Sequence, residues 1–411
     1  MTTLDMFATQ DLPRALPKGW RWIKIREIGP VTDGDWILNT DYSPSGVRLL
    51  QVGDVGSGKF VGKSSRYITE ERARELNCTF LQPRDILISR MPDPIGRACI
   101  LPDLGYPCIT AVDVSVWRPR ANIANPEFLS FFLNSPDWFI TVAALASGAT
   151  RARISRSNLE NIEIPLPPLP EQRRIAAILA EQLAAVERAR AAAAERLAAA
   201  QALPAAYLRA VFESEAARRW PKTKLGNLLQ LRKDVVHPYD NPQGIATFVG
   251  LEHVESQTGR RIGGIEIEMA ELTGRKPRFY KGDIVYGYLR PYLNKLWLAE
   301  FDGLCSVDQY VYSVKPEIAN TEFVAWFMRS PVYLDRAPIN TTPGQLPRIR
   351  TEEVVTVEIN LPSLMEQQRI AATVTGWMAA AAEARTAIAA QLAAIEALPA
   401  ALLRRAFSGQ L

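Results

Sequence analysis

The sequence has few of the residues on which most active sites depend. It contains only two histidines, His237 and His253, and both fall in the same part of the chain, so a Ser-His-Asp or Cys-His centre is not indicated. Its four cysteines form no C-x-x-C pair, so the pattern indicates neither a zinc site nor a disulfide framework.

Two further catalytic motifs are missing. No aspartate or glutamate stands two positions before any lysine, so the D/E-x-K segment typical of metal-dependent nucleases is absent. An Asn/Asp-Pro-Pro-Tyr/Phe loop, which an N6-adenine methyltransferase would need, does not occur either. The stretch Gly53-Asp-Val-Gly-Ser-Gly-Lys59 imitates a phosphate-binding loop, but Phe60 stands where that motif requires Ser or Thr. We therefore expect a protein without a catalytic centre of its own.

Export and membrane signals are also lacking. The first twenty residues contain no apolar stretch of the kind found in signal peptides, and no uninterrupted run of 18 apolar residues occurs. We therefore expect a cytoplasmic protein. With 411 residues, 47% of them hydrophobic and 22% charged, the composition is typical of a soluble protein with two or three domains.

The most informative feature that is present is a duplicated segment. Residues 166–212 and 361–407 align without a gap at an offset of 195, and more than half of the aligned positions are identical. Each copy opens on a proline-bearing turn, continues with Glu-Gln, and then runs through strong helix formers. This pattern predicts two helices of about 40 residues, each roughly 60 Å long at 1.5 Å per residue.

Apolar residues recur alternately four and three positions apart along both copies, which is a heptad pattern. Each apolar seam is broken at equivalent places, by Arg190 and Pro204 in one copy and by Arg385 and Pro399 in the other. An apolar seam of this kind needs a partner helix in water. The matching interruptions favour pairing of the two copies over two unrelated helices packed on separate domains. We expect the two arginines to turn toward solvent or toward nearby acids such as Glu187.

The segments that precede the two helices are related more faintly. Asn125-Pro-Glu-Phe-Leu matches Asn320-Thr-Glu-Phe-Val, and Ser135-Pro matches Ser330-Pro, at the same offset of 195. Short β-rich runs between Gly, Pro and Asp turns, followed by two short helices, predict an α+β domain with a mixed sheet in each half. The predicted organisation is a domain over 1–165, a long helix over 166–214, a second domain over 215–360 and a second long helix over 361–411.

The front halves of the two domains differ, and residues 39–74 have little in common with residues 241–276. Cations gather in short loops of the first domain. The windows 59–66 and 147–156 each contain three lysines or arginines and no acid. Clustered cations of this kind favour a polyanionic partner.

The duplicated helix starts, LPPLPEQRRI at 166–175 and LPSLMEQQRI at 361–370, resemble the specificity subunit of type I restriction–modification enzymes. The opening LPKGW at 16–20 and the basic loop SGATRARI at 147–154 resemble the same family. The counterpart of that loop, TTPGQLPRI at 341–349, lacks the Ser-Gly start and is a looser match. The resemblance covers essentially the whole chain.

The resemblance implies a non-catalytic DNA-binding subunit. Two similar target-recognition domains, related by a pseudo-two-fold internal repeat, would each read one half of a split DNA sequence. The long helices would pair as an antiparallel intramolecular coiled coil that sets the spacing and docks two methyltransferase subunits. Restriction subunits would join them for cleavage, and S-adenosylmethionine, ATP and magnesium would belong to those partners. A solitary modification enzyme and a coiled-coil scaffold that binds only protein remain as alternatives.

DNA contacts are expected from two kinds of loop. The basic loops should bind phosphates and set the register, whereas the divergent loops should read bases. The aromatic rings of Tyr288 and Tyr292 are expected to pack rather than to contact bases. For each candidate residue the alternative is a solvated surface charge. The candidate DNA contacts are Lys59, Lys63, Arg66, Arg151, Arg153 and Arg156 in the first domain and Arg290, Asn294, Lys295, Gln345 and Arg348 in the second.

Overall fold

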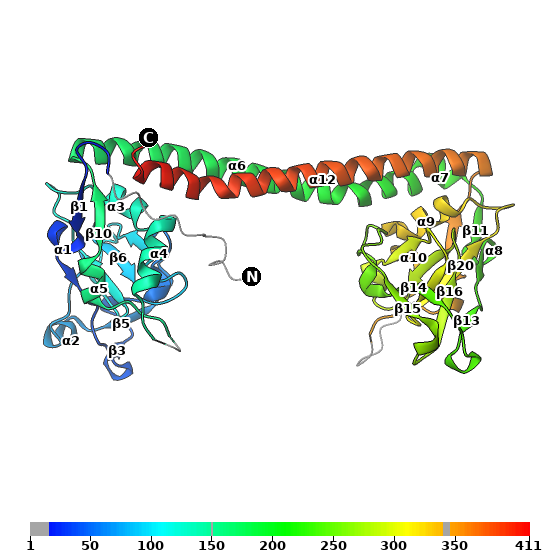
Figure 1. Cartoon of the computed structure of the whole chain (residues 1–411), viewed down its shortest axis with the longest axis horizontal. Helices are drawn as coiled ribbons and strands as arrows, with labels where there is room; N and C mark the ends of the chain where they lie inside the picture. The colour runs from blue at the N-terminus through cyan, green and yellow to red at the C-terminus, as the bar shows by residue number, and fades with distance from the viewer. Residues whose placement is uncertain (1–15, 149–150, 340–345) are drawn as a thin grey trace. The chain divides into compact units, whose positions relative to one another are not determined.

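The computed structural model describes residues 16–148, 151–339 and 346–411, and these form two compact units. The first unit runs to residue 192 and includes residues 391–411, and the second spans residues 193–390. Each unit contains one α+β domain and part of both long helices, α6 (Leu169–Phe212) and α12 (Leu364–Phe407) (Figure 1).

Two four-stranded sheets and a strand pair build the first domain. Within the sheets, β4 and β8 run parallel, and the other paired strands are antiparallel. The strands, in sheet order, are β2 (Val31–Thr32), β9 (Val114–Trp117), β6 (Ile86–Ser89) and β7 (Ala98–Ile100); then β3 (Tyr42–Ser43), β5 (Arg66–Ile68), β4 (Val47–Leu50) and β8 (Cys108–Thr110); and the pair β1 (Arg21–Lys24) and β10 (Glu163–Leu166). The helices are α1 (Ile25–Ile28), α2 (Glu70–Glu75), α3 (Pro126–Phe132), α4 (Pro136–Leu145) and α5 (Arg156–Asn161), with 3-10 turns η2 (Asn39–Asp41) and η3 (Val52–Asp54).

The second domain repeats this plan with one more strand. Its parallel pair is β14 with β19. The strands, in sheet order, are β12 (Leu229–Leu231), β20 (Gln309–Val314), β17 (Ile284–Gly287) and β18 (Leu296–Leu298); then β13 (Val235–Val236), β16 (Lys276–Phe279), β19 (Gly303–Cys305), β14 (Ile245–Val249) and β15 (Ile265–Glu268); and the pair β11 (Lys222–Lys224) and β21 (Glu358–Asn360). The helices are α7 (Glu215–Arg219), α8 (Leu225–Leu228), α9 (Thr321–Arg329), α10 (Pro331–Arg336) and α11 (Thr351–Val354), with 3-10 turns η4 (Pro238–Asp240), η5 (Leu251–His253), η6 (Met269–Glu271) and η7 (Pro291–Leu293).

The predicted α+β fold with mixed sheets and two long helices is confirmed. Both helices are 44 residues long and continue through Pro204 and Pro399. They begin a few residues later than the sequence predicted, because the chain first completes the strands β10 and β21.

The long helices pair antiparallel within each unit. In the first unit the start of α6 and the end of α12 share one core, in which the Phe407 ring lies 5.4 Å from the ring of Phe128 and 5.0 Å from that of Phe132. In the second unit the end of α6 meets the start of α12, and the rings of Tyr207 and Trp377 lie 5.3 Å apart. The expected intramolecular partner of each helix is therefore the other copy.

The ends of α12 are those of a packed helix. Within the described part of the chain, α12 is the one single helix long and apolar enough to cross a membrane by length and composition, and α3 with α4 would pass only as one bent pair. Ile370 and Val374 are buried in the core of the second unit, and Leu403 and Phe407 in that of the first. Both ends of α12 are therefore packed into protein cores.

The Gln of the duplicated Glu-Gln motif fastens each long helix to its domain. Gln172 is fully buried, and its amide donates to the carbonyls of Pro167 (2.8 Å) and Ile123 (3.1 Å) while its oxygen accepts from Asn125 N–H (2.8 Å). The same three bonds recur around Gln367, with Pro362, Ile318 and Asn320. Asn125 and Asn320 in turn cap α3 and α9. The Glu-Gln motif on which the family resemblance depends therefore has a structural role, because its glutamine holds the start of each long helix against its domain.

Replacing this glutamine should destabilise the protein strongly. Gln172→Ala leaves a buried N–H and two buried carbonyls without partners, so we expect a loss of about 2–4 kcal/mol in the free energy of unfolding. Glu181→Ala, at an exposed position on the same helix, is the matched control and should change that free energy by about 0.5 kcal/mol or less. Urea unfolding measures both. Equal effects of the two substitutions would contradict the stabilising role of the Gln172 hydrogen bonds.

Arg190 follows the expectation for the interrupted seam. Its guanidinium donates to both carboxylate oxygens of Glu187, at 3.0 and 2.7 Å, and remains largely exposed. This ion pair raises the pKa of Arg190 and lowers that of Glu187. The charge is therefore turned away from the apolar seam, which avoids the cost of burying it.

Candidate nucleic-acid interface

The loop that carries Lys59 and Lys63 is shaped by side chains beneath it. Arg48 donates from its guanidinium to the carbonyls of Gly62 (2.9 Å) and Ser64 (2.7 Å), on either side of Lys63. The buried carboxylate of Asp54 accepts from the N–H of Ser64 at 2.8 Å. Both lysines are exposed, so this arrangement fixes their backbone and leaves their ammonium groups free for an anion.

Arg66 opens strand β5 and is exposed. Its guanidinium donates to the Tyr42 hydroxyl at 2.7 Å and lies over the Tyr42 ring, 4.9 Å from the centroid. No carboxylate among the described residues forms an ion pair with Arg66, so its charge remains available to a phosphate.

The basic loop 147–156 is closed by a β-bridge between Ser147 and Arg153. Arg153 is not a free cation, because its guanidinium pairs with Asp113 at 3.1 Å and donates to the Val112 carbonyl at 3.3 Å. Asp113 is one of the duplicated residues, matched by Asp308 in the second domain. Arg153 therefore anchors the loop that presents the exposed residues Arg151 and Arg156.

Arg90 is a residue of this site that the sequence analysis missed. It follows strand β6, is 4% exposed, and donates to the Val112 carbonyl at 2.6 Å while pairing with Asp33 at 2.8 Å. Burial lowers the pKa of Arg90, and the nearby Arg153 and Arg156 add to that effect. The only signal in the sequence was a cation directly after a buried strand.

The second domain places two of its candidate residues side by side. Arg290 is exposed at φ +49, and its N–H donates to the carbonyl of Pro347 at 2.7 Å. Arg348, the counterpart of Arg153, forms a β-bridge with Leu289. The loops 288–290 and 346–349 thus bring Arg290 and Arg348 together. Gln345 lies outside the described residues.

Two predicted contacts in the second domain are placed differently from the prediction. Asn294 is fully buried, and its amide donates to the carbonyl of Arg329 at 2.8 Å, so the prediction of a groove contact is wrong for this residue. An amide that ends a turn at positive φ (+44) serves the fold instead. Lys295 is half-buried and donates from Nζ to the Leu251 carbonyl at 2.6 Å, which ties down its ammonium group.

The two tyrosines near Arg290 differ. The Tyr288 ring stacks on that of Tyr310 with centroids 4.4 Å apart, and burial raises the pKa of Tyr310 to about 12, so the packing prediction is confirmed for Tyr288. Tyr292 is 51% exposed, and for it the packing prediction is wrong. An exposed aromatic ring next to an exposed arginine suits contact with a nucleic acid.

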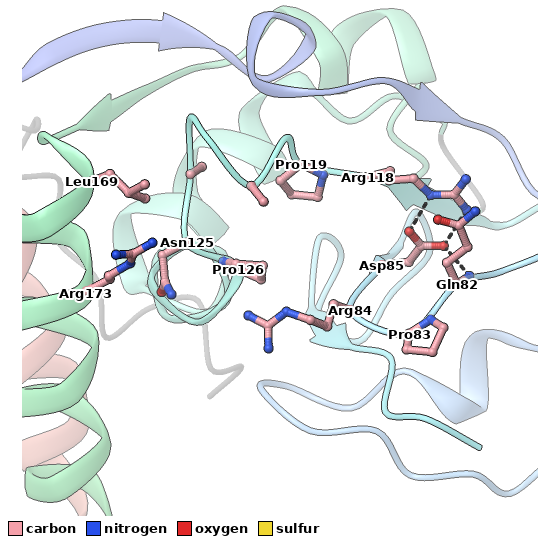
Figure 2. Close-up of a pocket in the computed structure, with 12 residues that line it drawn as sticks. Gln82, Pro83, Arg84, Asp85, Arg118, Pro119, Asn125, Pro126, Leu169 and Arg173 are labelled. Atoms are coloured by element: carbon pink, nitrogen blue, oxygen red, sulfur yellow. Dashed lines mark hydrogen bonds and ion pairs between the residues drawn. The ribbon is translucent and has the colours of Figure 1, made fainter. Parts of the chain in front are cut away.

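A pocket of about 300 Å³ in the first domain is lined by Arg84, Arg118 and Arg173 (Figure 2). Arg118 makes two bonds of 2.7 Å to the buried Asp85, and Arg84 pairs with Glu127. The second domain has a corresponding ion pair, Arg232 with Asp283, although Arg232 follows β12 whereas Arg118 follows β9. Because most of this charge is neutralised by partners, the pocket is a structural feature of the domain rather than a phosphate site.

Groups able to hold a metal ion are not found in the described ranges: no three His, Cys, Asp or Glu side chains converge there. All four cysteines are free and buried. Burial raises the pKa of Cys78 to about 11 and that of Cys99 and Cys305 to about 12, so these thiols are protonated at neutral pH.

The sequence and the fold are similar to those of known proteins. Residues 17–196 match the family described as "Type I restriction modification DNA specificity domain". The chain is 27% identical over 295 residues to the EcoDI type I restriction enzyme specificity subunit of Escherichia coli, which covers 64% of this chain and 66% of that protein. It is 22% identical over 437 residues to the EcoKI specificity subunit of the same species, covering 96% and 90%. The match to the EcoDI subunit thus spans slightly less than two thirds of that relative.

Solved structures show the same fold. A chain from a type I restriction–modification system is superimposed with a TM-score of 0.75 at 20% identity, covering 97% of this chain and all of the other. The HsdS subunit from Thermoanaerobacter tengcongensis gives 0.67 at 19% identity, covering 98% and 100%. The chain is thus similar in sequence, over its first domain, to the type I restriction–modification DNA specificity family, and similar in fold to subunits of such systems.

The contacts of Arg151 and Arg153 predict different effects of substitution. Arg151→Ala should weaken binding to all DNA duplexes and lower the slope of log K against log salt by about one, as loss of one phosphate contact does. Arg153→Ala should weaken binding more, because it also releases the loop from Asp113. Asp113→Asn releases the loop but removes no cation, so it should weaken binding without lowering the slope. Titrations in increasing salt measure all three, and a changed base preference in Arg151→Ala would contradict the assignment.

Proposed function

We propose that this chain is the sequence-specific DNA-binding subunit of a type I restriction–modification complex, with each domain binding one half of a bipartite target. The observation that supports it most is a pair of corresponding bonds. Ile154 N–H donates to the Arg90 carbonyl (3.3 Å), and its counterpart Ile349 N–H donates to the Tyr288 carbonyl (3.2 Å). Each bond holds a loop with an arginine, Arg153 or Arg348, in the same place on its domain. The loops around them differ, as two readers of different sequences require.

The proposed DNA contacts follow from exposure and charge. In the first domain the exposed cations should bind phosphates, and in the second Arg290 and Arg348 should do so with Tyr292 beside them. Bases would be read by the divergent loops, in which arginine can bind guanine, and glutamine or asparagine can bind adenine. The exposed first-domain cations are Lys59, Lys63, Arg66, Arg151 and Arg156.

The remaining parts are assigned by the same proposal. Residues 1–165 and 215–360 would be the target-recognition domains, and the paired helices would set their spacing and dock two methyltransferase subunits. Restriction subunits, where present, would join that complex. S-adenosylmethionine, ATP and magnesium would bind to those partners and not to this chain.

Two assays test the proposal together. In a gel-shift assay with labelled genomic duplexes, the purified chain should bind some duplex sequences and not others. Addition of a methyltransferase subunit should increase the affinity for the duplexes that are bound. The chain alone should transfer no methyl group. Methyl transfer by the chain alone would favour a solitary modification enzyme, and no DNA binding in either sample would favour a protein-binding scaffold.

A further inference from the structure

The divergent part of each domain contains one loop closed by a β-bridge. In the first domain Val55 pairs with Phe60, and the bridge encloses four residues, 56–59, which we call the short loop. In the second domain Val254 pairs with Arg261 and encloses six residues, 255–260, which we call the long loop.

The two loops occupy corresponding places. Each follows a 3-10 turn, η3 or η5, in which a side chain at the third position accepts from the N–H before the turn: Asp54 from Gln51 (2.6 Å) and His253 from Gly250 (3.0 Å). Each loop also has a glycine at positive φ near its end, Gly58 at +73 and Gly259 at +66. The loops therefore differ in length by two residues, although both follow the same kind of 3-10 turn and both have a glycine at positive φ near their end.

The short loop is bonded directly to the first strand residue of β7. Gly58 N–H donates to the carbonyl of Ala98 at 2.9 Å. Asn134, which stands just before the Ser-Pro start of α4, donates to the same carbonyl at 3.0 Å. The Ala98 carbonyl thus accepts hydrogen bonds both from the short loop and from the residue before α4, and so connects both to strand β7.

The long loop reaches the corresponding strand only through a side chain. Arg329 is the counterpart of Asn134 at the offset of 195, and Leu296, which opens β18, corresponds to Ala98. Arg329 donates from Nε to the Leu296 carbonyl (3.2 Å), as Asn134 does to Ala98. Its additional length lets Nη2 donate to the carbonyl of Gly259 in the long loop, also at 3.2 Å.

The burial of Arg329 shows that this contact is more than a surface interaction. The residue is 8% exposed, forms no ion pair with a described carboxylate, and stacks over the Trp326 ring at 4.6 Å. Burial lowers its pKa to about 10, so the guanidinium is still charged at neutral pH. Keeping an unpaired charge inside a domain is costly, and its hydrogen bonds to carbonyls are what offset that cost.

We propose that Arg329 is the positioning residue of the long loop, a longer side chain that compensates for two extra loop residues and thereby sets which bases the second domain reads. The inference rests on the proposed function, because that proposal assigns base reading to the divergent loops. In both domains a side chain at the same aligned position binds the opening residue of the corresponding strand. The shorter Asn134 accompanies the four-residue loop, and the longer Arg329 accompanies the six-residue loop.

The bond of Arg329 to the Gly259 carbonyl, which we call the clamp, also affects the residues around Arg290. Gln257 in the long loop donates from its N–H to the Leu293 carbonyl at 3.0 Å and from its amide to the carbonyl of Tyr292. Asn294 binds the Arg329 carbonyl from the other side of η7. Loss of the clamp should therefore loosen both the long loop and the turn that presents Tyr292.

Two glycine substitutions provide a matched comparison. Gly58→Ala and Gly259→Ala each place a side chain at positive φ, so both carry the same backbone strain. At Gly58 the added Cβ would meet no atom within 4 Å, whereas at Gly259 it would collide with the Arg329 guanidinium. Gly259→Ala should therefore disturb its loop much more than Gly58→Ala does.

A double-substitution cycle gives the decisive test on the full chain. The variants are Arg329→Asn, replacement of residues 255–260 by the short-loop sequence Gly-Ser-Gly-Lys, and both together. Amide hydrogen exchange around the loop and in residues 290–295 should become about tenfold faster in each single variant. In the combined variant, in which the first domain's combination is restored, exchange in the loop should return to the wild-type rate, whereas residues 290–295 should stay fast because Gln257 has been replaced. Equal exchange in all variants, or no recovery of the loop in the combined one, would overturn the inference.

Binding to DNA separates this inference from the proposed function. With the methyltransferase subunit present, duplexes selected by the wild type from a random library define its two half-sites. Arg329→Asn should relax base preference about tenfold or more in one half-site and leave the other unchanged, because the first domain is untouched. If the wild type selects no sequence, the proposed function is refuted. The hydrogen-exchange experiment still tests independently whether Arg329 holds the long loop. Unchanged preference in both half-sites would refute the role of Arg329 in reading.

Discussion

Inserting seven residues after Ala193 and seven after Ile388 should lengthen the unread gap of the target by about three base pairs. Seven residues preserve the heptad phase, so each apolar seam still faces its partner helix. The insertions add roughly 10 Å of helix at 1.5 Å per residue, which is about three base pairs at 3.4 Å per pair if helices and DNA run parallel. The bases read should be the same, because neither domain is altered.

The matched control is the seven-residue insertion made in only one of the two helices. It breaks the register between α6 and α12, so it should destabilise the pair instead of lengthening the gap. The methylated sites of the complex report the gap directly. The angle between the two half-sites changes by about a quarter turn or more with three base pairs, so affinity should fall even where the gap is right. An active double-insertion variant that keeps the original gap would show that the helices do not set the spacing.

Exchanging one domain should change one half of the target completely. Replacing residues 20–160 with the corresponding domain of a related subunit keeps β10, α6 and Gln172, so the bond of Gln172 to the Pro167 carbonyl is retained and its bonds at positions 123 and 125 pass to the donor domain. We expect the first half-site to become that of the donor. Each mismatched base pair costs about 1–3 kcal/mol, so three changed pairs should lower binding to the old target by on the order of a thousandfold or more.

The reciprocal exchange of residues 220–355 serves as the control for that result. It should change the other half-site and leave the first as it was. Selection of duplexes by each chimaera with the methyltransferase subunit measures both halves at once. A change in both halves after a single exchange would mean that the two domains read the target jointly.

The fold could be predicted from the sequence because its signals are local. Runs of Ala, Leu, Glu and Arg after a proline turn specify α6 and α12, and their shared interruptions indicate that they pair. The Asn and Ser positions duplicated at 125 and 320, and at 135 and 330, are the caps of short helices. The length of the helices was predicted within a few residues, and only the strands before them shift the start.

The candidate site was predicted less completely, because charge in a sequence does not reveal burial. Exposed residues such as Lys59 and Arg151 lie where a basic loop suggests. Asn294 was chosen for its amide chemistry, yet its amide serves a turn inside the domain. Arg90 and Arg329 could not be found in this way, since each is a buried cation that donates to the backbone carbonyl of a residue distant in sequence.

The repeat itself contains information that a single domain would not. Asn134 and Arg329 occupy one aligned position, and only the structure shows that both bind the opening residue of a corresponding strand. Their difference in length becomes meaningful once the loops above them are seen to differ by two residues. The two halves of the chain thus make the same contact with side chains of different length.

Selection from a random duplex library tests the central claim most directly. The complex of this chain with a methyltransferase subunit should enrich duplexes that contain two short specified blocks separated by an unspecified gap of fixed length. Substitution of Arg290, an exposed cation assigned to phosphate, should weaken binding to all duplexes equally and leave both blocks unchanged. One contiguous block, or no enrichment at all, would contradict the account of two domains that each read half of a divided target.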